Sequence, residues 1–438
     1  MGSGAMRPVA VDLFAGAGGL SLGFEQAGFD VVAAVEYDPI HAMVHRFNFP
    51  ECEVLCRDVR SLSAADVLSA AQKGMRRLRR PSNAPPKIDV LIGGPSCQGF
   101  SSIGRRDEED DRNDLLLEFA RLVREIKPRA FVLENVPGLL EPRFSDFRKK
   151  VFAKLKRAGY QLGGTEGWVD ANQFGVAQVR KRVVIVGILD GSPSPLTSSW
   201  KEKLPTVSNA LEGLPEIESY DELLRLDWVE IEQRDRLRRL SATSSYARIL
   251  SGVDKQDYFG RPRTSNINLL TNSLRTVHGP ESIRRFAATA QGTEEPVSRL
   301  FRLALDLPAR TLRAGTGSER GAHTSPRPIH PIIPRVITVR EAARIHGYPD
   351  WFRLAATNWH GHRQVGNSVP PPLARAAGEA VLRALGLKPR KLRAAQNLGD
   401  AQWLNIRPFV AARLSNAVQV ELPAKRIRKN VSSDAVAS

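Results

Sequence analysis

Cysteine is scarce in this chain, and long apolar stretches are missing from it. Three cysteines in 438 residues, Cys52, Cys56 and Cys97, are too few for a disulfide framework and are typical of a reducing compartment. No uncharged apolar run approaches the roughly 20 residues that cross a bilayer. The N-terminus lacks a signal-peptide pattern, and Met1–Ala5 resembles an expression tag before Met6. These absences exclude a disulfide-stabilised secreted domain and a membrane-spanning chain, and they predict a cytoplasmic protein.

Basic residues outnumber acidic ones. The chain has 64 Lys and Arg against 47 Asp and Glu, which gives a formal net charge of +17. With 42% hydrophobic and 25% charged residues, the composition is that of an ordinary globular protein, and the length predicts two domains or one large domain with insertions. The positive charge favours a polyanionic partner, although charge alone does not separate nucleic acid from a basic surface that only keeps the protein soluble.

Short apolar segments alternate with amphipathic segments over the first 190 residues. The apolar segments are nearly uninterrupted, as in buried parallel strands, and they lie at residues 9–14, 31–35, 90–92, 131–133 and 183–186. Helical patterns lie between them at residues 20–27, 39–47, 113–127 and 144–158. This alternation predicts an α/β fold with a doubly wound sheet, and the Pro- and Gly-rich residues 191–195 mark its boundary.

The region from about 205 to 335 has a different pattern. It begins with a charged stretch at residues 220–240, which we expect to be helical, and continues as a Gly-, Arg- and Thr-rich region with little periodicity. Helical patterns return at residues 338–346 and 372–385, and the last fifty residues are basic. The sequence therefore predicts a smaller, irregular second domain inserted before the chain returns to the first.

A glycine-rich turn follows the first predicted strand. Residues 12–20 read DLFAGAGGL, in which Gly16 and Gly18 allow a tight turn at a helix N-terminus. Glu36 ends the next strand, where a carboxylate can accept hydrogen bonds from ribose hydroxyls, and Asp58 follows the third apolar run. The spacing departs from G-x-G-x-x-G because Ser21 replaces the third glycine. Together these residues favour a nucleoside-type cofactor over a simple turn, without naming the cofactor.

Cys97 lies just beyond the end of another predicted strand. Its neighbours are Pro, Ser, Gln and Gly, which favours a loop over a buried position, and a loop thiol near basic groups can act as a nucleophile. Cys52 and Cys56 lack such surroundings and are interpreted as structural. The charged residues 104–113 either form a lid over Cys97 or are a solvated charge run. The spacing of His41 and His45 lacks a metal-binding pattern, so no metal is predicted.

An acid and two arginines end the series of candidate residues. Glu134 closes a predicted strand, where a buried carboxyl group can hold a proton and donate it to a heterocyclic nitrogen. Gln178, Arg180 and Arg182 precede the last strand, and strand alternation places them on one face with Lys181 opposite. Taken alone, basic residues before a strand are more often solvated than functional.

These segments together resemble the ordered motifs of the DNA cytosine-5 methyltransferases. The similar segments are DLFAGAGGLSLGF, GGPSCQGFS, ENV, QVRKR, REAARIHGYPDWF and GNSVPPPLA, which cover about residues 9–190 and 335–385. The resemblance implies that Cys97 is the nucleophile that attacks cytosine C6, that Glu134 binds N3 and the exocyclic amine, that Arg182 contacts O2 and that Arg180 supports the catalytic loop. The chain has Ser96 where the family most often has a second proline before the cysteine.

The resemblance also implies S-adenosylmethionine as the cofactor. The matching positions for binding it are Phe14, Gly16, Gly18, Glu36, Tyr37, Asp58, Val59, Leu115, Asn367, Ser368 and Val369. The last three lie far along the chain, so the chain must return to its first strands, and we expect the helix at 372–385 to pack there.

The implied partner is duplex DNA. The resemblance divides the chain into a Rossmann-like S-adenosylmethionine-binding catalytic domain (7–204), a target-recognition region (205–335), a return to the catalytic domain (336–388) and a basic extension (389–438). The target cytosine would be flipped out of a specific duplex sequence. Residues 310–317 are the best candidate for a phosphate contact. We expect a bacterial, nucleoid-associated monomer on DNA, for which a cognate restriction or phage-defence system is a candidate partner.

Two alternatives remain open from the sequence. An RNA cytosine-5 methyltransferase that acts on tRNA is less favoured, because the tRNA-methylating members usually follow Cys-Gln with Pro-Phe-Thr, whereas this chain has Gly99-Phe100-Ser101. A catalytically silent DNA-binding relative is less favoured because Cys97 and Glu134 are both present.

Overall fold

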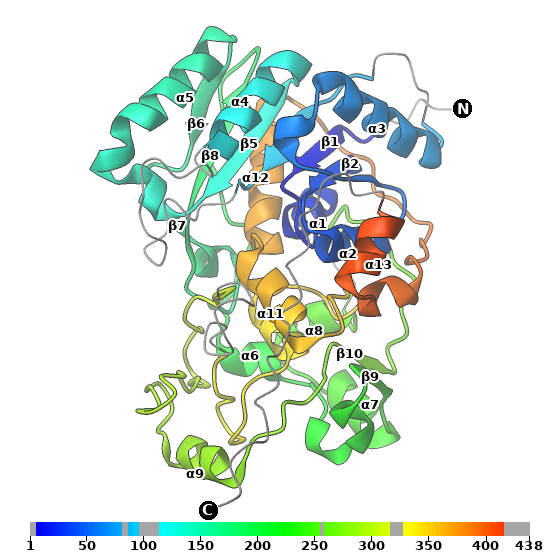
Figure 1. The fold of residues 1–438 in the computed structure, drawn as a ribbon, viewed down its shortest axis with the longest axis vertical. Helices are drawn as coiled ribbons and strands as arrows, with labels where there is room; N and C mark the ends of the chain where they lie inside the picture. Colours follow the sequence, from blue (N-terminus) through cyan, green and yellow to red (C-terminus); the bar gives the residue numbers. More distant parts are fainter. Residues whose placement is uncertain (1–5, 81–85, 96–113, 255–257, 316–326, 416–438) are drawn as a thin grey trace, which may run out of the picture.

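A mostly parallel sheet forms the centre of one half of the molecule (Figure 1). The computed structural model describes residues 6–80, 86–95, 114–254, 258–315 and 327–415. Within these ranges the sheet has eight strands in the order β3-β2-β1-β4-β5-β8-β6, with β7 paired to β8. The strands are β1 (Val9–Leu13), β2 (Asp30–Glu36), β3 (Glu53–Cys56), β4 (Val90–Gly93), β5 (Ala130–Asn135), β6 (Gln161–Gly164), β7 (Val169–Asp170) and β8 (Lys181–Ile188).

The predicted doubly wound α/β sheet is confirmed, with one correction to strand direction. Strands β1 to β5 pair in parallel, but β8, which we expected to be parallel as well, runs antiparallel to β5 and to β6. No crossover helix separates β6 from β8, so the chain simply turns back along the same sheet. Because β8 is buried on both faces, its apolar run has the same appearance in either direction.

Helices cover both faces of the sheet. One face packs against α1 (Gly19–Ala27), α2 (Pro39–Asn48) and α12 (Pro371–Ala384), and the other packs against α3 (Ala64–Arg77), α4 (Asp114–Ile126) and α5 (Ser145–Arg157). The alternation along β1 separates the two cores, because Ala10 belongs to the first and Val9 and Val11 belong to the second. The four helices predicted near the N-terminus are confirmed over their described residues, as α1, α2, α4 and α5.

Local sequence explains where several of these helices begin. Asp38 accepts the backbone N–H of Ile40 at the start of α2, where Pro39 is the first helical residue. Ser63 and Asp66 form a reciprocal capping box at α3. Each cap satisfies backbone donors that have no partner within the helix, so the chain leaves the sheet at a defined residue.

The other half of the molecule is smaller and mostly irregular (Figure 1). Its elements are α6 (Val207–Leu211), β9 (Trp228–Glu230), α7 (Gln233–Leu240), α8 (Ser245–Ser251), β10 (Leu269–Thr271) and α9 (Pro280–Ala288). The expectation of one helix over 220–240 was wrong, because only 233–240 is α-helical. Val229 and Ile231 point inward at alternate positions and pack in one cluster with Leu270, so the local period is that of a strand. The many charged residues in the stretch conceal this alternation in the sequence.

The chain then returns to the sheet, as expected. After α10 (Val339–Ile345) and α11 (Asn358–Asn367), helix α12 lies along α1 so closely that a Cβ atom on Gly23 would be 2.3 Å from that of Ala374. Only glycine permits this approach. The last described helix, α13 (Pro408–Leu414), lies against α2 (Figure 1). None of the helices in the described ranges is both long enough and apolar enough to cross a membrane.

Candidate active site

The glycine-rich turn joins β1 to α1 at the carboxyl edge of the parallel strands. Gly16 has a φ of 57°, and the space that its Cβ would occupy is open to 4 Å. Gly18 also has a positive φ, 104°, but its Cβ would lie 2.5 Å from the ring of Phe49. Gly16 therefore borders open space, whereas Gly18 is required for packing. Phe14 holds a positive φ of 62°, which turns the chain out of the strand.

Glu36 closes the neighbouring strand and braces this turn. One carboxylate oxygen accepts the N–H of Gly16 at 2.7 Å, and the other accepts the N–H of Asp38 at 2.8 Å. His41 is buried and lies 3.8 Å from the carboxylate. Burial raises the pKa of the Glu36 carboxyl, and His41 and the two backbone donors oppose this rise.

The other predicted cofactor residues on β2, β3 and α4 surround the same edge. Tyr37 directly follows Glu36 and is 47% exposed. Asp58 follows β3, and both of its carboxylate oxygens accept hydrogen bonds from the side chain of Arg60, which lowers the pKa of Asp58 despite partial burial. Val59 is buried beneath it, and Leu115 is half-buried in the first turn of α4.

The return of the chain brings residues 367–369 to the glycine turn. A Cβ atom on Gly19 would be 2.4 Å from the carbonyl oxygen of Val369 and 3.1 Å from the Cβ of Ser368. Asn367, the last residue of α11, is exposed beside them. Residues separated by about 350 positions are therefore in direct contact, as the sequence predicted.

A buried polar chain lies under the turn. Ser21 donates to the Asp12 carboxylate at 2.6 Å, and its hydroxyl is 2.9 Å from Nε2 of His45. Burial raises the pKa of Asp12 to about 7 and lowers the pKa of His45 to about 3. His45 is therefore a buried, neutral residue.

Glu134 and Arg182 form an ion pair at the same edge of the sheet. Nε of Arg182 is 2.6 Å from a carboxylate oxygen of Glu134, and both side chains are largely buried. Burial raises the pKa of Glu134, and the positive charges of Arg182 and Arg180 oppose that rise. The structure thus brings together two residues that are 48 positions apart in the sequence.

The chain that leads to Cys97 runs beside Glu134. A Cβ atom on Gly94 would be 3.1 Å from a carboxylate oxygen of Glu134, and the amide of Asn135 donates to the carbonyl of Pro95 at 3.4 Å. Cys97 itself and the charged segment at 104–113 lie outside the described residues. Asn135, a residue to which sequence reasoning gave no role, therefore anchors the start of this segment.

Arg180 is fully buried and binds backbone carbonyl groups. Its guanidinium donates to the carbonyl oxygens of Leu312 at 2.9 Å, Gly366 at 2.7 Å and Ser368 at 3.1 Å. It therefore holds the returning chain against the strand that carries Arg182.

Gln178 extends this network to a residue that sequence reasoning missed. The side-chain oxygen of Gln178 accepts the backbone N–H of Leu312, so the side-chain amide nitrogen donates to Nδ1 of His346 at 3.0 Å. Burial and the charge of Arg180 lower the pKa of His346 well below its ordinary value, which makes it neutral. Nε2–H then donates to the carbonyl of Ser368 at 3.1 Å. The only signal for this role was the position of His346 inside a recognised motif.

An aromatic ring and a lysine lie beside Arg182 on the opposite face. In the β7–β8 pairing Val169 is opposite Arg182, and the Nζ of Lys181 lies 3.8 Å above the ring of Trp168. Trp168 remains 46% exposed. An exposed cation and aromatic ring therefore border the edge of the sheet that carries Glu134.

Several arginines of the irregular region are not free to bind a partner. Arg263 is buried between Glu25 and Glu51, and Arg261 is paired with Asp30. Arg310 begins the segment 310–317 that is predicted to contact phosphate; its side chain is 64% exposed, stacks on Phe301 and pairs with Glu294. Residues 316–317 of that segment lie outside the described ranges. The exposed arginines of this region for which the described residues supply no ion pair are Arg225, Arg236, Arg284, Arg299 and Arg313.

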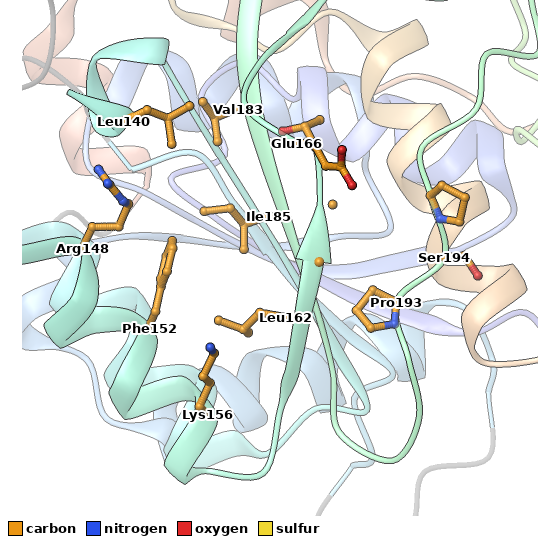
Figure 2. A pocket seen from close by; sticks show the side chains of 14 residues that line it. Leu140, Arg148, Phe152, Lys156, Leu162, Glu166, Val183, Ile185, Pro193 and Ser194 are labelled. Carbon is orange, nitrogen blue, oxygen red and sulfur yellow. The ribbon is translucent and has the colours of Figure 1, made fainter. Parts of the chain in front are cut away.

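A separate groove lies away from these residues. A groove of about 440 Å³ opens between α5, β6, β8 and residues 193–195, and Figure 2 shows Phe152, Leu162 and Ile185 around it. Arg148 and Lys156 also line it. None of the predicted site residues contributes to its described lining. Among the residues that the structure describes, no cluster of three His, Cys, Asp or Glu side chains is arranged to hold a metal ion.

The family model that describes C-5 cytosine-specific DNA methylases matches residues 9–383. The chain is 46% identical over 409 residues to the type II methyltransferase M.XorII of Xanthomonas oryzae pv. oryzae, covering 93% of this chain and 92% of the relative. It is 32% identical to the type II methyltransferase M1.HphI of Haemophilus parahaemolyticus, covering 85% and 86%.

Solved structures give the same assignment of fold. The crystal structure of a DNA modification methyltransferase encoded within an E. coli prophage has a TM-score of 0.69 and 32% identity, covering 86% of this chain and 99% of that one. The S. pombe Dnmt2 methyltransferase is similar in fold, with a TM-score of 0.51 at 17% identity, covering 87% of this chain and all of that one. On these matches, the chain belongs to the family of C-5 cytosine-specific DNA methylases.

Proposed function

We propose that this protein transfers a methyl group from S-adenosylmethionine to carbon 5 of a cytosine within a specific sequence of duplex DNA. The observation that carries the proposal is the Glu134–Arg182 ion pair, which lies at the sheet edge next to the start of the segment that contains Cys97. The glycine turn and Glu36 lie along the same edge. A base-binding pair and a nucleoside site are thus adjacent, as a transfer between the two ligands requires.

The described residues fit the cofactor. Open space beside Gly16 admits the methionine portion, and each Glu36 oxygen accepts only one backbone N–H, which leaves lone pairs for ribose hydroxyls. The exposed Tyr37 ring offers a face for adenine. In the proposal, the remaining contacts come from Phe14, Gly18, Asp58, Val59, Leu115 and Asn367–Val369. When bound, the cofactor would supply an electrophilic methyl group on a sulfonium sulfur, which would keep the electron pair of the broken S–CH3 bond and leave as a neutral thioether.

Cys97 is the proposed nucleophile. Its thiolate forms a bond to cytosine C6, and the electron pair of the C5–C6 double bond moves toward N3 and C5, which makes C5 nucleophilic enough to take the methyl group. Loss of the C5 proton to a base then restores the C5–C6 double bond, and the C6–sulfur bond breaks to return the thiolate.

Glu134 and Arg182 are proposed to hold the base during this attack. A carboxyl group whose pKa is raised by burial can keep a proton and donate it to N3 as negative charge develops there, while its other oxygen accepts from the exocyclic amine. Arg182 is close enough to Glu134 to contact O2 of the same ring. Arg180 is proposed to act by positioning the backbone, since its guanidinium donates to the carbonyl groups of Leu312, Gly366 and Ser368.

The target cytosine is proposed to be flipped out of the duplex, because a stacked base cannot reach a catalytic pocket at the sheet edge. Residues 7–204 and 336–388 would form the catalytic domain and residues 205–335 the target-recognition region. Within that region the candidates for contacts with phosphates or guanine edges are the exposed Arg225, Arg236, Arg284, Arg299 and Arg313. We further propose action as a monomer in the bacterial cytoplasm, with or without a companion restriction or defence system.

The experiment that tests this proposal is covalent trapping. Long duplex DNA in which every cytosine is replaced by 5-fluorocytosine presents all target sequences at once, and fluorine at C5 blocks the final elimination. We expect a DNA adduct of the protein that requires S-adenosylmethionine and is lost in Cys97→Ala. A matched tRNA containing 5-fluorocytosine serves as the control substrate.

Each outcome decides between the candidates. Trapping on DNA alone supports the proposal, trapping on tRNA in preference to DNA refutes it in favour of an RNA methyltransferase, and no adduct on either substrate favours a silent DNA-binding protein. Bisulfite sequencing of DNA from expressing cells then identifies the methylated sequence.

A further inference from the structure

The chain continues past α12 in an extension, residues 387–415, that the family match does not cover. The match ends at residue 383. Near the start of the extension, Pro389 lies 2.4 Å from the position of a Cβ on Gly28, at the end of α1. The carbonyl of Arg390 accepts a hydrogen bond from the buried guanidinium of Arg7 at 3.2 Å. The first part of the extension is therefore fixed to the catalytic half of the molecule.

The last part of the extension crosses α2. The N–H of Gly399 donates to the carbonyl of Phe47 at 2.8 Å, and the guanidinium of Arg46 lies 5.2 Å from the ring centroid of Trp403. Helix α13 then packs against α2, with Ala411 fully buried (Figure 1). The extension is therefore held on the catalytic half at both of its ends.

Between these two places the extension meets a segment of the smaller half. Residues 258–264, here called the connecting segment, lie in the link between α8 and β10 and run along α1. The N–H of Phe259 donates to the carbonyl of Gln26 at 3.0 Å. The side chain of Arg263 is fully buried and pairs with Glu25 at 2.7 Å and with Glu51 at 3.4 Å. The side of the connecting segment that carries this arginine therefore faces the catalytic half.

Gln396 of the extension binds the connecting segment through its backbone. Its N–H donates to the carbonyl of Pro262 at 2.9 Å, and its carbonyl accepts the N–H of Thr264 at 2.9 Å. The two bonds form a parallel bridge in which Gln396 is opposite Arg263. The connecting segment is thus enclosed between the catalytic half, which holds its buried arginine, and the extension, which holds its backbone.

We propose that the extension is a positioning element for target recognition: by pairing with residues 262–264 it fixes the recognition region relative to the base-binding pair Glu134 and Arg182. The inference rests on the proposed function and adds a part of the chain that the family pattern does not assign. Strand β10 follows the connecting segment and packs with β9 in the smaller half, so a shift of the connecting segment is passed on to these strands. A misplacement of about 1 Å is enough to impair a reaction that depends on the orientation of its reactants.

Two matched pairs of variants test the inference. Gln396→Pro removes the N–H that donates to Pro262, whereas Gln396→Ala keeps it. Thr264→Pro removes the N–H that donates to Gln396, whereas Thr264→Ala keeps it and changes only an exposed side chain. Each pair therefore differs in one backbone hydrogen bond between the extension and the connecting segment.

Sequence discrimination is the main readout. The parent chain and each variant methylate a library of duplex DNA of random sequence, and bisulfite sequencing gives the relative rate at every sequence, so the target need not be known beforehand. The KM for the preferred duplex and kcat are then measured on that duplex. Cofactor Kd is measured without DNA by equilibrium dialysis with labelled S-adenosylmethionine, and urea unfolding reports stability.

The expected change follows from the loss of one backbone hydrogen bond. We expect each proline variant to raise the KM for DNA about fivefold, with kcat and cofactor Kd within about twofold of the parent chain. Methylation at sequences one base pair away from the target should rise about three- to fivefold relative to the target, because a less firmly held recognition region adapts to them. Both alanine variants should behave like the parent chain.

The outcomes separate this inference from the proposed function. Unchanged discrimination and an unchanged KM for DNA in the proline variants refute the inference even if stability falls, because the extension would then serve stability alone. An equal loss of cofactor and DNA affinity also refutes it, because the effect would be global. Trp403→Ala loosens the crossing of α2 without altering a backbone group, and it carries the same test if both proline variants fail to fold. Failure of the parent chain to methylate any sequence in the library would instead overturn the proposed function.

Discussion

Replacing Arg180 by alanine should destabilise the protein and loosen the cofactor site, although Arg180 need not touch the cytosine. The guanidinium is fully buried and donates to three backbone carbonyl groups, those of Leu312, Gly366 and Ser368. Alanine reaches none of them. The variant would leave the carbonyl groups of Leu312 and Gly366 without this donor and that of Ser368 with His346 alone. The space is too narrow for the returning chain to rearrange freely, since a Cβ on Gly366 would already lie 2.3 Å from the backbone nitrogen of Ala314.

The magnitude follows from the number and kind of these bonds. A hydrogen bond from a charged donor contributes about 1.5–3 kcal/mol, and the three bonds share one side chain, so they do not add fully. Relief of the desolvation cost of the buried charge offsets part of the loss. We therefore expect the free energy of unfolding to fall by roughly 3–5 kcal/mol, with a smaller loss of about half that amount for Arg180→Lys, whose single ammonium cannot reach all three carbonyls.

Urea unfolding followed by tryptophan fluorescence measures the change. Lys181→Ala, one residue away on the exposed face of the same strand, is the matched control and should change the free energy of unfolding by less than about 1 kcal/mol. Cofactor Kd should also rise in Arg180→Ala, since Ser368 loses its support. If Arg180→Ala unfolds at the same urea concentration as the parent chain but loses methyl transfer, the guanidinium acts on substrate and this reasoning fails.

Three other predictions follow from the site. Glu134→Gln cannot supply a carboxyl proton, so single-turnover methyl incorporation should fall by about 10²–10³-fold while cofactor Kd changes less than about twofold; unchanged turnover would contradict the role of Glu134. The pKa of Asp12, about 7 against 3.8, favours its protonated form in the folded protein, so its contribution to stability is present below pH 4 and falls by roughly 4 kcal/mol as pH rises through 7. In urea titrations, Asp12→Asn should therefore gain stability relative to the parent chain between pH 5 and pH 8. Parallel curves of unfolding free energy against pH for the two chains would disprove this. Replacement of Trp168 or Lys181 by alanine should raise the KM for DNA about three- to tenfold at constant kcat and, for Lys181, reduce the salt dependence of DNA binding; a change in kcat alone would exclude a contact with the DNA backbone.

The parts of the site that follow from strand ends could be predicted from the sequence. Because the carboxyl ends of parallel strands meet at one edge, the positions of Gly16, Glu36 and Glu134 after apolar runs already implied that they lie near one another. The direction of β8 could not be predicted, because a strand buried on both faces has no polar alternation that distinguishes the two directions.

Long-range partners were also beyond the sequence pattern. The arginines at 261 and 263 belong to a region expected to face DNA, yet they are paired with Asp30, Glu25 and Glu51, more than 200 positions away. No local period encodes such a pairing. His346 is similar, because only the fold places its ring between Gln178 and Ser368.

The contact of the glycine turn with Val369, and of α1 with α12, has a consequence for biosynthesis. During translation the first strands emerge long before residues 366–384, yet one face of the sheet and one wall of the proposed cofactor site are built from those late residues. The apolar side of α1 therefore stays exposed to solvent until some 350 further residues have been synthesised. If translation stops before these residues, the released chain lacks one wall of the proposed cofactor site and cannot complete its hydrophobic core. A truncated product would therefore be an aggregation-prone polypeptide rather than a partly active enzyme.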